Sequence, residues 1–298
     1  MEEIWLGLLV INTDGGIEAD LTVVCIDNNH FRIISSAATR ERDKFHINKY
    51  LSKDIELKDI TDDLCVFGLF GPKSRELIKT ISKDKFDNDN FKFGTAKYIT
   101  IEGVKIWAQR LSYVGELGYE LYVEFKDAKK IYELIINTGK DFNISNCGMH
   151  AMDIMRMESG FLHWGHDISP EENQYQAGLS FTISSKKDVD FTGKQALKKI
   201  KQEKTKRRFA MFTLKESEPG KPLVLHDEPI YIDDRIVGRS TSGNYSFNFK
   251  KNLVFGYITT DLSNTELESK NLFIEIEKQK YPIDLQLEPL KKNNFKLI

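Results

Sequence analysis

Hydrophobic and polar residues alternate along the first two thirds of the chain in patterns typical of both strands and helices. An apolar run from Ile4 and a second run over 21–26 flank Asn12–Gly16, and such a turn sequence predicts a hairpin. The pattern further predicts strands over 31–35, 65–70 and 119–125, a hairpin over 97–109, and helices over 39–51, after Pro72, over 128–138 (capped by Gly139) and over 150–158. Interspersed strands, helices and hairpins make this part α+β.

From Arg207 the pattern changes to short strands alone. They are expected over 208–214, 229–232, 235–240, 253–259, 271–277 and 280–287, with no helix between them. This spacing predicts a small antiparallel barrel or sandwich. We therefore expect one domain over 1–190, a basic linker over 191–206 and a C-terminal β-barrel domain over 207–298.

Composition narrows the function classes. The 298 residues carry 43 basic and 45 acidic side chains, a formal charge of −2, and 40% of them are hydrophobic, as in ordinary globular proteins. This balance gives no field that would attract nucleic acid or an anionic membrane surface. The longest apolar run, Ile4–Ile11, is far shorter than the ~20 residues of a membrane helix.

The three cysteines are Cys25, Cys65 and Cys147, an odd number without CxxC spacing. This indicates a reducing compartment without a disulfide framework, and we expect a cytoplasmic protein. Cys25 and Cys65 lie in apolar strand-like runs, where buried thiols are expected.

Two loops carry candidate chemistry. In the first, Asp20 follows a Gly-Gly turn where the chain enters an apolar strand, so its carboxylate is either a surface charge or a positioned base. The second, Ser112–Glu120, combines glycines, tyrosines and glutamates between two strands. Glycine allows close approach of a planar ligand, tyrosine stacks, and glutamate accepts paired N–H donors. From the residues alone, each loop is more often a simple turn.

Other motifs are weaker indications of function. His163, His166 and Asp167, with His150 earlier, could bind zinc or iron, but Gly165 interrupts their spacing, and we expect no metal site. The basic segment around 194–208 could bind a polyanion, although a solvated linker helix with Ala196, Leu197 and Ile200 facing inward is favoured. The chain has no dinucleotide fingerprint, nucleophile elbow or HExxH motif.

Taken together, seven segments resemble one known family. They read GGIEADLTV at 15–23, AATRERD at 37–43, GPKS at 71–74, LSYVGELGYELYV at 111–123, AMDIMRMESGFLHWGHDI at 151–168, FTGKQALKKIK at 191–201 and GRSTSGNYSFNFKKNLVFGYI at 238–258. The chain resembles the tetrahydrofolate-binding aminomethyltransferase family, which includes the glycine cleavage T-protein. The sequences YVGELGYELY at 113–122 and TSGNYS at 241–246 more closely resemble the folate-binding parts of dimethylglycine and sarcosine dehydrogenases.

The resemblance implies a folate-binding domain that transfers a one-carbon unit. By motif position, Asp20 is the carboxylate beside the reacting folate nitrogens, Tyr113 and Glu120 hold the pterin, and Arg156 is assigned to ligand binding. The implied acceptor is tetrahydrofolate, which would take a methylene group from glycine, sarcosine or dimethylglycine to give methylene-tetrahydrofolate. No flavin site is expected in this chain.

Three departures from the family pattern shape this expectation. Only fourteen residues precede Gly15, so the N-terminal part of the family domain is expected to be missing or supplied by an upstream subunit. Met152 stands where T-protein relatives have arginine, and 173–179 replaces a segment that carries proline and glutamate. An alternative is therefore a non-catalytic folate-binding or assembly subunit of a flavin-dependent demethylating oxidoreductase, and a product that folds poorly is a third.

Overall fold

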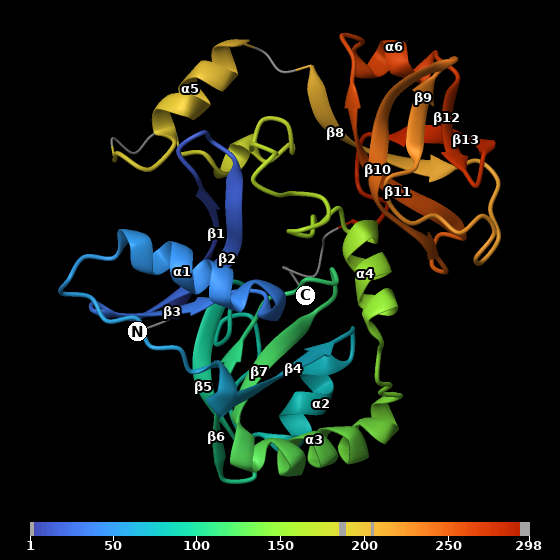
Figure 1. Ribbon diagram of the computed structural model, residues 1–298. Helices are drawn as coiled ribbons and strands as arrows, with labels where there is room; N and C mark the ends of the chain where they lie inside the picture. Colours follow the sequence, from blue (N-terminus) through green and yellow to red (C-terminus); the bar gives the residue numbers. More distant parts are fainter. Residues whose placement is uncertain (1–2, 185–188, 204–205, 293–298) are drawn as a thin grey trace. The chain divides into compact units, whose positions relative to one another are not determined.

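The computed structural model describes residues 3–184, 189–203 and 206–292 (Figure 1). They fall into two compact units, each described by itself below. One contains the chain up to Leu8 together with Leu21–Cys147; the other contains Leu9–Asp20 and Gly148–Lys292. The expected boundaries at 190 and 206 stay a prediction, and residues 185–188, 204–205 and 293–298 lie outside the described residues.

A seven-stranded antiparallel sheet dominates the first unit. Its order is β3-β2-β1-β5-β6-β7-β4. The strands are β1 (Glu3–Ile11), β2 (Ile17–Asp27), β3 (His30–Ile34), β4 (Leu64–Phe70), β5 (Thr95–Ile101), β6 (Val104–Gln109) and β7 (Gly118–Glu124). The β5–β6 hairpin turns at Glu102 and Gly103, both with positive φ, as the sequence predicted.

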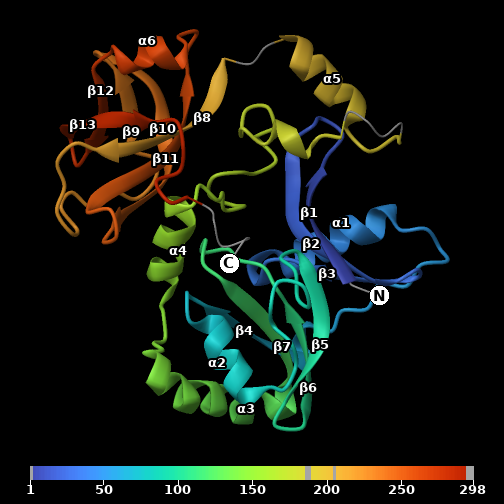
Figure 2. The same ribbon diagram turned by 180° about the vertical axis from the view of Figure 1, so that it is seen from behind.

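Helices cover one face of this sheet. The helices α2 (Ser74–Ile81) and α3 (Phe125–Gly139) lie beside β4 and β7 (Figures 1 and 2). Their side chains form the main core with Ile106, Leu121 and Val123. The opposite face carries a smaller cluster around Trp107 and Tyr122, and α1 (Arg40–Tyr50) lines a cavity there.

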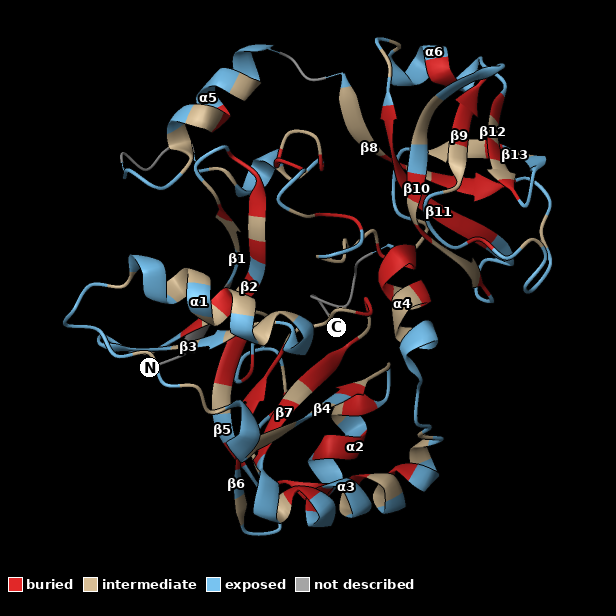
Figure 3. Cartoon of the chain, in the orientation of Figure 1, coloured by how far each residue is buried: buried red, intermediate tan, exposed pale blue. Residues whose placement is uncertain are grey.

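The second unit contains a closed barrel, which confirms the predicted α+β chain with a C-terminal antiparallel barrel. Its strand order is β10-β11-β8-β13-β12-β9. The strands are β8 (Arg207–Leu214), β9 (Pro229–Ile232), β10 (Arg235–Ser246), β11 (Lys251–Thr259), β12 (Leu272–Ile276) and β13 (Gln279–Gln286). Buried residues follow their inner faces (Figure 3).

Two helices accompany the barrel in this unit. The helix α4 (Met149–Glu158) packs on β10 and β11 through Ile154 and Met157. The helix α5 (Lys194–Glu203) buries Leu197, as expected of an amphipathic linker helix.

Three local expectations are wrong. The short helix α6 (Asn264–Glu268) interrupts the barrel strands and begins with a capping box of Ser263 and Glu266. Gly139 keeps a helical φ of −66°, and the chain continues as a 3₁₀ turn to Asn143, the left-handed residue. Cys25 is exposed and Cys65 is only partly buried, although both lie in strands as expected; all three cysteines are free thiols.

Within the described ranges, no helix combines the length and the apolar character needed to cross a membrane.

Candidate functional site

The outward face of β6 and β7 places a carboxylate among aromatic and amide side chains. Trp107 pairs with Tyr122 across the two strands, and Gln109 pairs with Glu120. Because side chains two residues apart on a strand point to the same face, these four share one surface. The sequence-predicted residue Glu120 therefore lies on the face opposite the main hydrophobic core.

Glu120 is held by a tyrosine that the sequence interpretation did not single out. The Tyr122 hydroxyl donates to Glu120 Oε2 over 2.6 Å. Burial raises the pKa of the Glu120 carboxyl, and the hydrogen bond from Tyr122 lowers it in part. The bond uses Oε2, and a carboxylate has about four acceptor sites, so Glu120 can still accept further donors.

Aromatic rings form the neighbouring surface. The rings of Trp107 and Tyr122 lie 4.9 Å apart between centroids, and the Arg32 guanidinium lies 4.0 Å from the Trp107 centroid. Arg32 comes from β3, so three strands contribute to this surface. The two rings are tilted by 60° and both residues are buried, so they form a packed aromatic cluster beside the Glu120 carboxylate.

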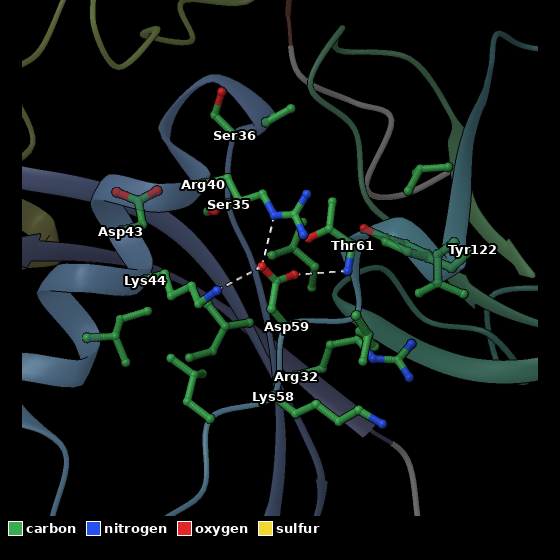
Figure 4. Close-up of a pocket in the computed structure, with 18 residues that line it drawn as sticks. Arg32, Ser35, Ser36, Arg40, Asp43, Lys44, Lys58, Asp59, Thr61 and Tyr122 are labelled. Carbon is green, nitrogen blue, oxygen red and sulfur yellow. Dashed lines mark hydrogen bonds and ion pairs between the residues drawn. The ribbon is translucent and has the colours of Figure 1, made fainter. Parts of the chain in front are cut away.

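A cavity of about 280 Å³ adjoins Tyr122 in the same unit (Figure 4). The helix α1, the end of β3 and the segment 57–61 line it. The Asp59 carboxylate receives Arg40 at 2.8 Å and the Thr61 amide at 3.0 Å, and Lys44 lies 3.6 Å away. Arg40 belongs to the 37–43 motif, and this ion-pair cluster fixes α1 to the 57–63 segment. The sequence interpretation quoted the motif but did not predict the cavity.

Tyr113 lies in the loop that joins β6 to β7. The loop is tightened by Gly115, with φ of +67°, and by the Glu116 amide, which donates to Ser112 Oγ. Tyr113 is half-buried there. The first unit thus contains two of the predicted ligand-binding residues, Tyr113 and Glu120.

Asp20 belongs to the other unit, at the end of its β2 portion. The side chain is exposed, yet the surrounding protein desolvates it and raises the pKa of the carboxyl to about 6. It has no hydrogen bond or ion pair among the described residues. A carboxylate with this pKa and no partner suits proton transfer near neutral pH. The convergence of Asp20 with Tyr113 and Glu120 on one ligand stays a prediction.

Arg156 lies in a buried network rather than at a surface. It is 1% exposed, and its guanidinium donates to Asp153, Asp167, Ser242 and the Phe161 carbonyl. Asp167 in turn accepts from Thr241 and Ser242. The network joins α4 to β10, so two of the family-like segments meet here. Contact between Arg156 and a ligand stays a prediction.

The histidine pair shows no metal geometry. The rings of His163 and His166 lie 4.6 Å apart, and burial, with His166 nearby, lowers the pKa of His163. Over the described residues, no group of three or more histidine, cysteine, aspartate or glutamate side chains is arranged so that it could hold a metal ion.

The fold and site define a class: an α+β domain with a carboxylate-bearing aromatic face, followed by a six-stranded antiparallel barrel. The model of the GCVT N-terminal domain matches residues 6–187, and that of the glycine cleavage T-protein C-terminal barrel domain matches 207–292. The chain belongs to the aminomethyltransferase (glycine cleavage T-protein) family, as the motifs predicted.

Curated relatives agree with this membership. The chain is 33% identical over 284 residues to mitochondrial dimethylglycine dehydrogenase of Homo sapiens, covering 94% of this chain and 32% of that protein. It is 30% identical over 260 residues to the aminomethyltransferase of Anoxybacillus flavithermus, covering 87% of this chain and 70% of that protein. The chain thus spans about a third of the length of the dehydrogenase.

A solved structure shows the same fold. The glycine cleavage system aminomethyltransferase T from Bartonella henselae aligns with a TM-score of 0.81 at 18% identity, over 97% of this chain and 76% of that one.

Proposed function

We propose that this chain binds tetrahydrofolate and catalyses transfer of a one-carbon unit to it, forming methylene-tetrahydrofolate. The observation that carries the proposal is the Glu120 carboxylate, fixed by Tyr122 beside the Trp107 ring. A pterin is planar and presents two neighbouring N–H donors on its pyrimidinone edge. A carboxylate with remaining acceptor capacity next to an aromatic surface fits both features.

In this proposal, Glu120 and Tyr122 bind the ligand and Asp20 transfers a proton. Glu120 orients the pterin, and Tyr122 keeps the carboxylate in place. Tetrahydrofolate, when bound, supplies the nucleophilic nitrogens. Asp20 accepts a proton at one of them or stabilises positive charge there, and its raised pKa keeps it basic near neutral pH. Holding donor and acceptor together supplies much of the rate enhancement.

The one-carbon donor is an amine such as glycine, sarcosine or dimethylglycine. Similarity to dimethylglycine dehydrogenase supports a demethylating reaction, with the oxidation carried out by a flavin oxidoreductase on a separate or longer chain. The alternative is that the chain only binds folate or assists assembly with that partner; Met152, in place of the family arginine, favours it.

Calorimetric titration with tetrahydrofolate tests the proposal. We expect saturable binding that Glu120→Gln weakens about 10–100-fold, because a charge-assisted hydrogen bond contributes about 1.5–3 kcal/mol. Glu124→Gln, at the exposed end of the same strand, is the matched control and keeps wild-type affinity. No binding by the wild-type protein, with its oxidoreductase partner present, would refute the proposal.

A transfer assay separates catalysis from binding alone. Asp20→Asn is expected to bind tetrahydrofolate but to form no methylene-tetrahydrofolate, while Asp14→Asn, in the exposed turn before it, stays active. If the wild-type protein binds folate yet shows no Asp20-dependent turnover, the non-catalytic alternative holds.

A further inference from the structure

Gln109 carries a buried amide without hydrogen-bond partners. The residue is 0% exposed, and neither Oε1 nor Nε2 has a partner among the described residues. Buried polar groups are nearly always paired, because an unpaired one keeps the cost of desolvation without compensation. This amide therefore requires an explanation that packing alone does not give.

The position of Gln109 places that amide next to Glu120. The two residues pair across β6 and β7, and Trp107 and Tyr122 form the next pair on the same face. Directly opposed residues have Cβ atoms about 5 Å apart. On its other side Gln109 faces Ala96 of β5, which has no polar side chain to offer. The carboxylate side is thus where the amide can find a partner.

Resting on the proposed function, we infer that Gln109 is a specificity-determining residue of the pterin site, with Nε2 donating to the 4-oxo group. The pyrimidinone edge carries two donors, the 2-amino group and N3–H, beside one acceptor, the 4-oxo oxygen. An ionised carboxylate only accepts hydrogen bonds, so Glu120 matches the two donors and leaves the oxygen unmatched. The adjacent amide supplies the missing donor.

Ligand binding resolves the unpaired state of the amide. Glutamine has three rotatable side-chain bonds, so the amide reaches the ligand by rotating toward Glu120. The hydrogen bond that the amide forms with the ligand compensates for the desolvation cost of the unpaired amide in the ligand-free protein. A site built to hydrogen-bond a polar group discriminates strongly against ligands that lack it.

Removing the amide distinguishes a ligand contact from a packing role. Gln109→Met keeps the side-chain length and deletes both unpaired atoms, so the thermal unfolding temperature is expected to stay the same or rise. Tetrahydrofolate affinity is expected to fall about tenfold. The control is Asn252→Leu in the barrel, whose amide is 1% exposed but donates to the Pro222 carbonyl at 3.1 Å. That variant is expected to lose stability and to keep folate affinity.

A second variant tests the hydrogen-bond direction. Gln109→Glu replaces the donor by an acceptor, so it is expected to favour a 2,4-diaminopteridine analogue over the 4-oxo folate by tenfold or more relative to wild type. Equal affinity of wild type and Gln109→Met for tetrahydrofolate, or an unchanged ligand preference in Gln109→Glu, overturns the inference and leaves the proposed function standing. Absence of binding by the wild-type protein overturns both.

Discussion

Tyr122 donates its hydroxyl proton to Oε2 of Glu120 over 2.6 Å, two residues away on the same face of β7. The bond fixes the rotamer of the carboxylate and occupies one of its lone pairs. Since the ring of Tyr122 also packs on Trp107, the orientation of Glu120 depends on the aromatic cluster around it. Tyr122 can therefore affect ligand binding through the orientation of Glu120.

Tyr122→Phe is expected to weaken tetrahydrofolate binding about 3–10-fold, the effect of one lost hydrogen bond. The pH dependence should also change. Burial raises the pKa of Glu120 and the Tyr122 bond lowers it, so removal of the hydroxyl raises the pKa further. Only the ionised carboxylate accepts both pterin donors. As the pH is lowered, the affinity for tetrahydrofolate should therefore begin to fall at a higher pH in Tyr122→Phe than in wild type.

Titrations between pH 5 and 8 measure this shift. Tyr98→Phe, on the 45% exposed Tyr98 of β5, is the control and should follow the wild-type curve. Superimposable curves for Tyr122→Phe and wild type would show that the bond does not orient Glu120.

Asp20 predicts the pH dependence of turnover. Its carboxyl has a pKa of about 6, so it is a base above that pH and is protonated below it. The rate of methylene-tetrahydrofolate formation should fall as the pH decreases through about 6, with folate affinity changing less. A pH–rate profile at saturating folate tests this, and a rate that stays constant down to pH 5 would exclude Asp20 as the base.

The same shift affects stability. A folded-state pKa above the usual aspartate value of 3.8 means that the native protein loses stability as the pH rises from about 4 to 6. Asp20→Asn removes this cost, so at pH 7 it should be more stable than wild type. The full shift corresponds to about 3 kcal/mol, and solvent screening at an exposed side chain reduces it to the order of 1 kcal/mol. The gain should vanish at pH 4.

Local sequence signals predicted most of the fold. Turn residues at Asn12–Gly16 and Glu102-Gly103 correctly bounded hairpins, because Gly15 and Gly103 adopt the positive φ that these turns need. The five-residue helix α6 was missed because it is too short for a periodic pattern, although Ser263 and Glu266 carry the capping-box signal.

The site was only partly predictable. Motif position gave Glu120, but alternation along a strand does not tell which face borders a ligand. Tyr122 and Gln109 became candidates only when the register of β6 and β7 placed them beside Glu120. Arg156 shows the opposite case, because a motif arginine proved to be buried in an ion-pair network.

Arg156→Met is expected to destabilise the protein by about 3–5 kcal/mol, because it leaves the 1% exposed Asp167 without its cationic partner. Thermal or denaturant unfolding measures the loss. The control Arg239→Met, on β10, removes the partner of the exposed Asp227 and should cost less than 1 kcal/mol. If Arg156→Met instead keeps its stability and loses folate affinity, Arg156 acts on the ligand as its motif position implies.

The second glycine of the Gly15-Gly16 turn has a steric role that sets the start of β2. A Cβ at Gly16 would lie 2.0 Å from the carbonyl oxygen of Pro170, which is a backbone atom and cannot rotate away. The next residue, Ile17, donates its amide to the Glu172 carbonyl at 2.9 Å, so the strand begins against this segment. Any side chain at Gly16 must push the start of β2 away from the segment that contains Pro170 and Glu172.

Gly16→Ala is therefore expected to cost about 1–3 kcal/mol, the usual effect of forcing extra volume into a packed site. Because Asp20 lies four residues further along the displaced strand, the variant should also lose transfer activity. Gly148→Ala provides the control: nothing lies within 4 Å of a Cβ there and φ is −79°, so stability should change by less than about 0.5 kcal/mol. Denaturant unfolding of both variants decides the matter, since equal midpoints for Gly16→Ala and wild type would mean that the Pro170 segment yields without cost.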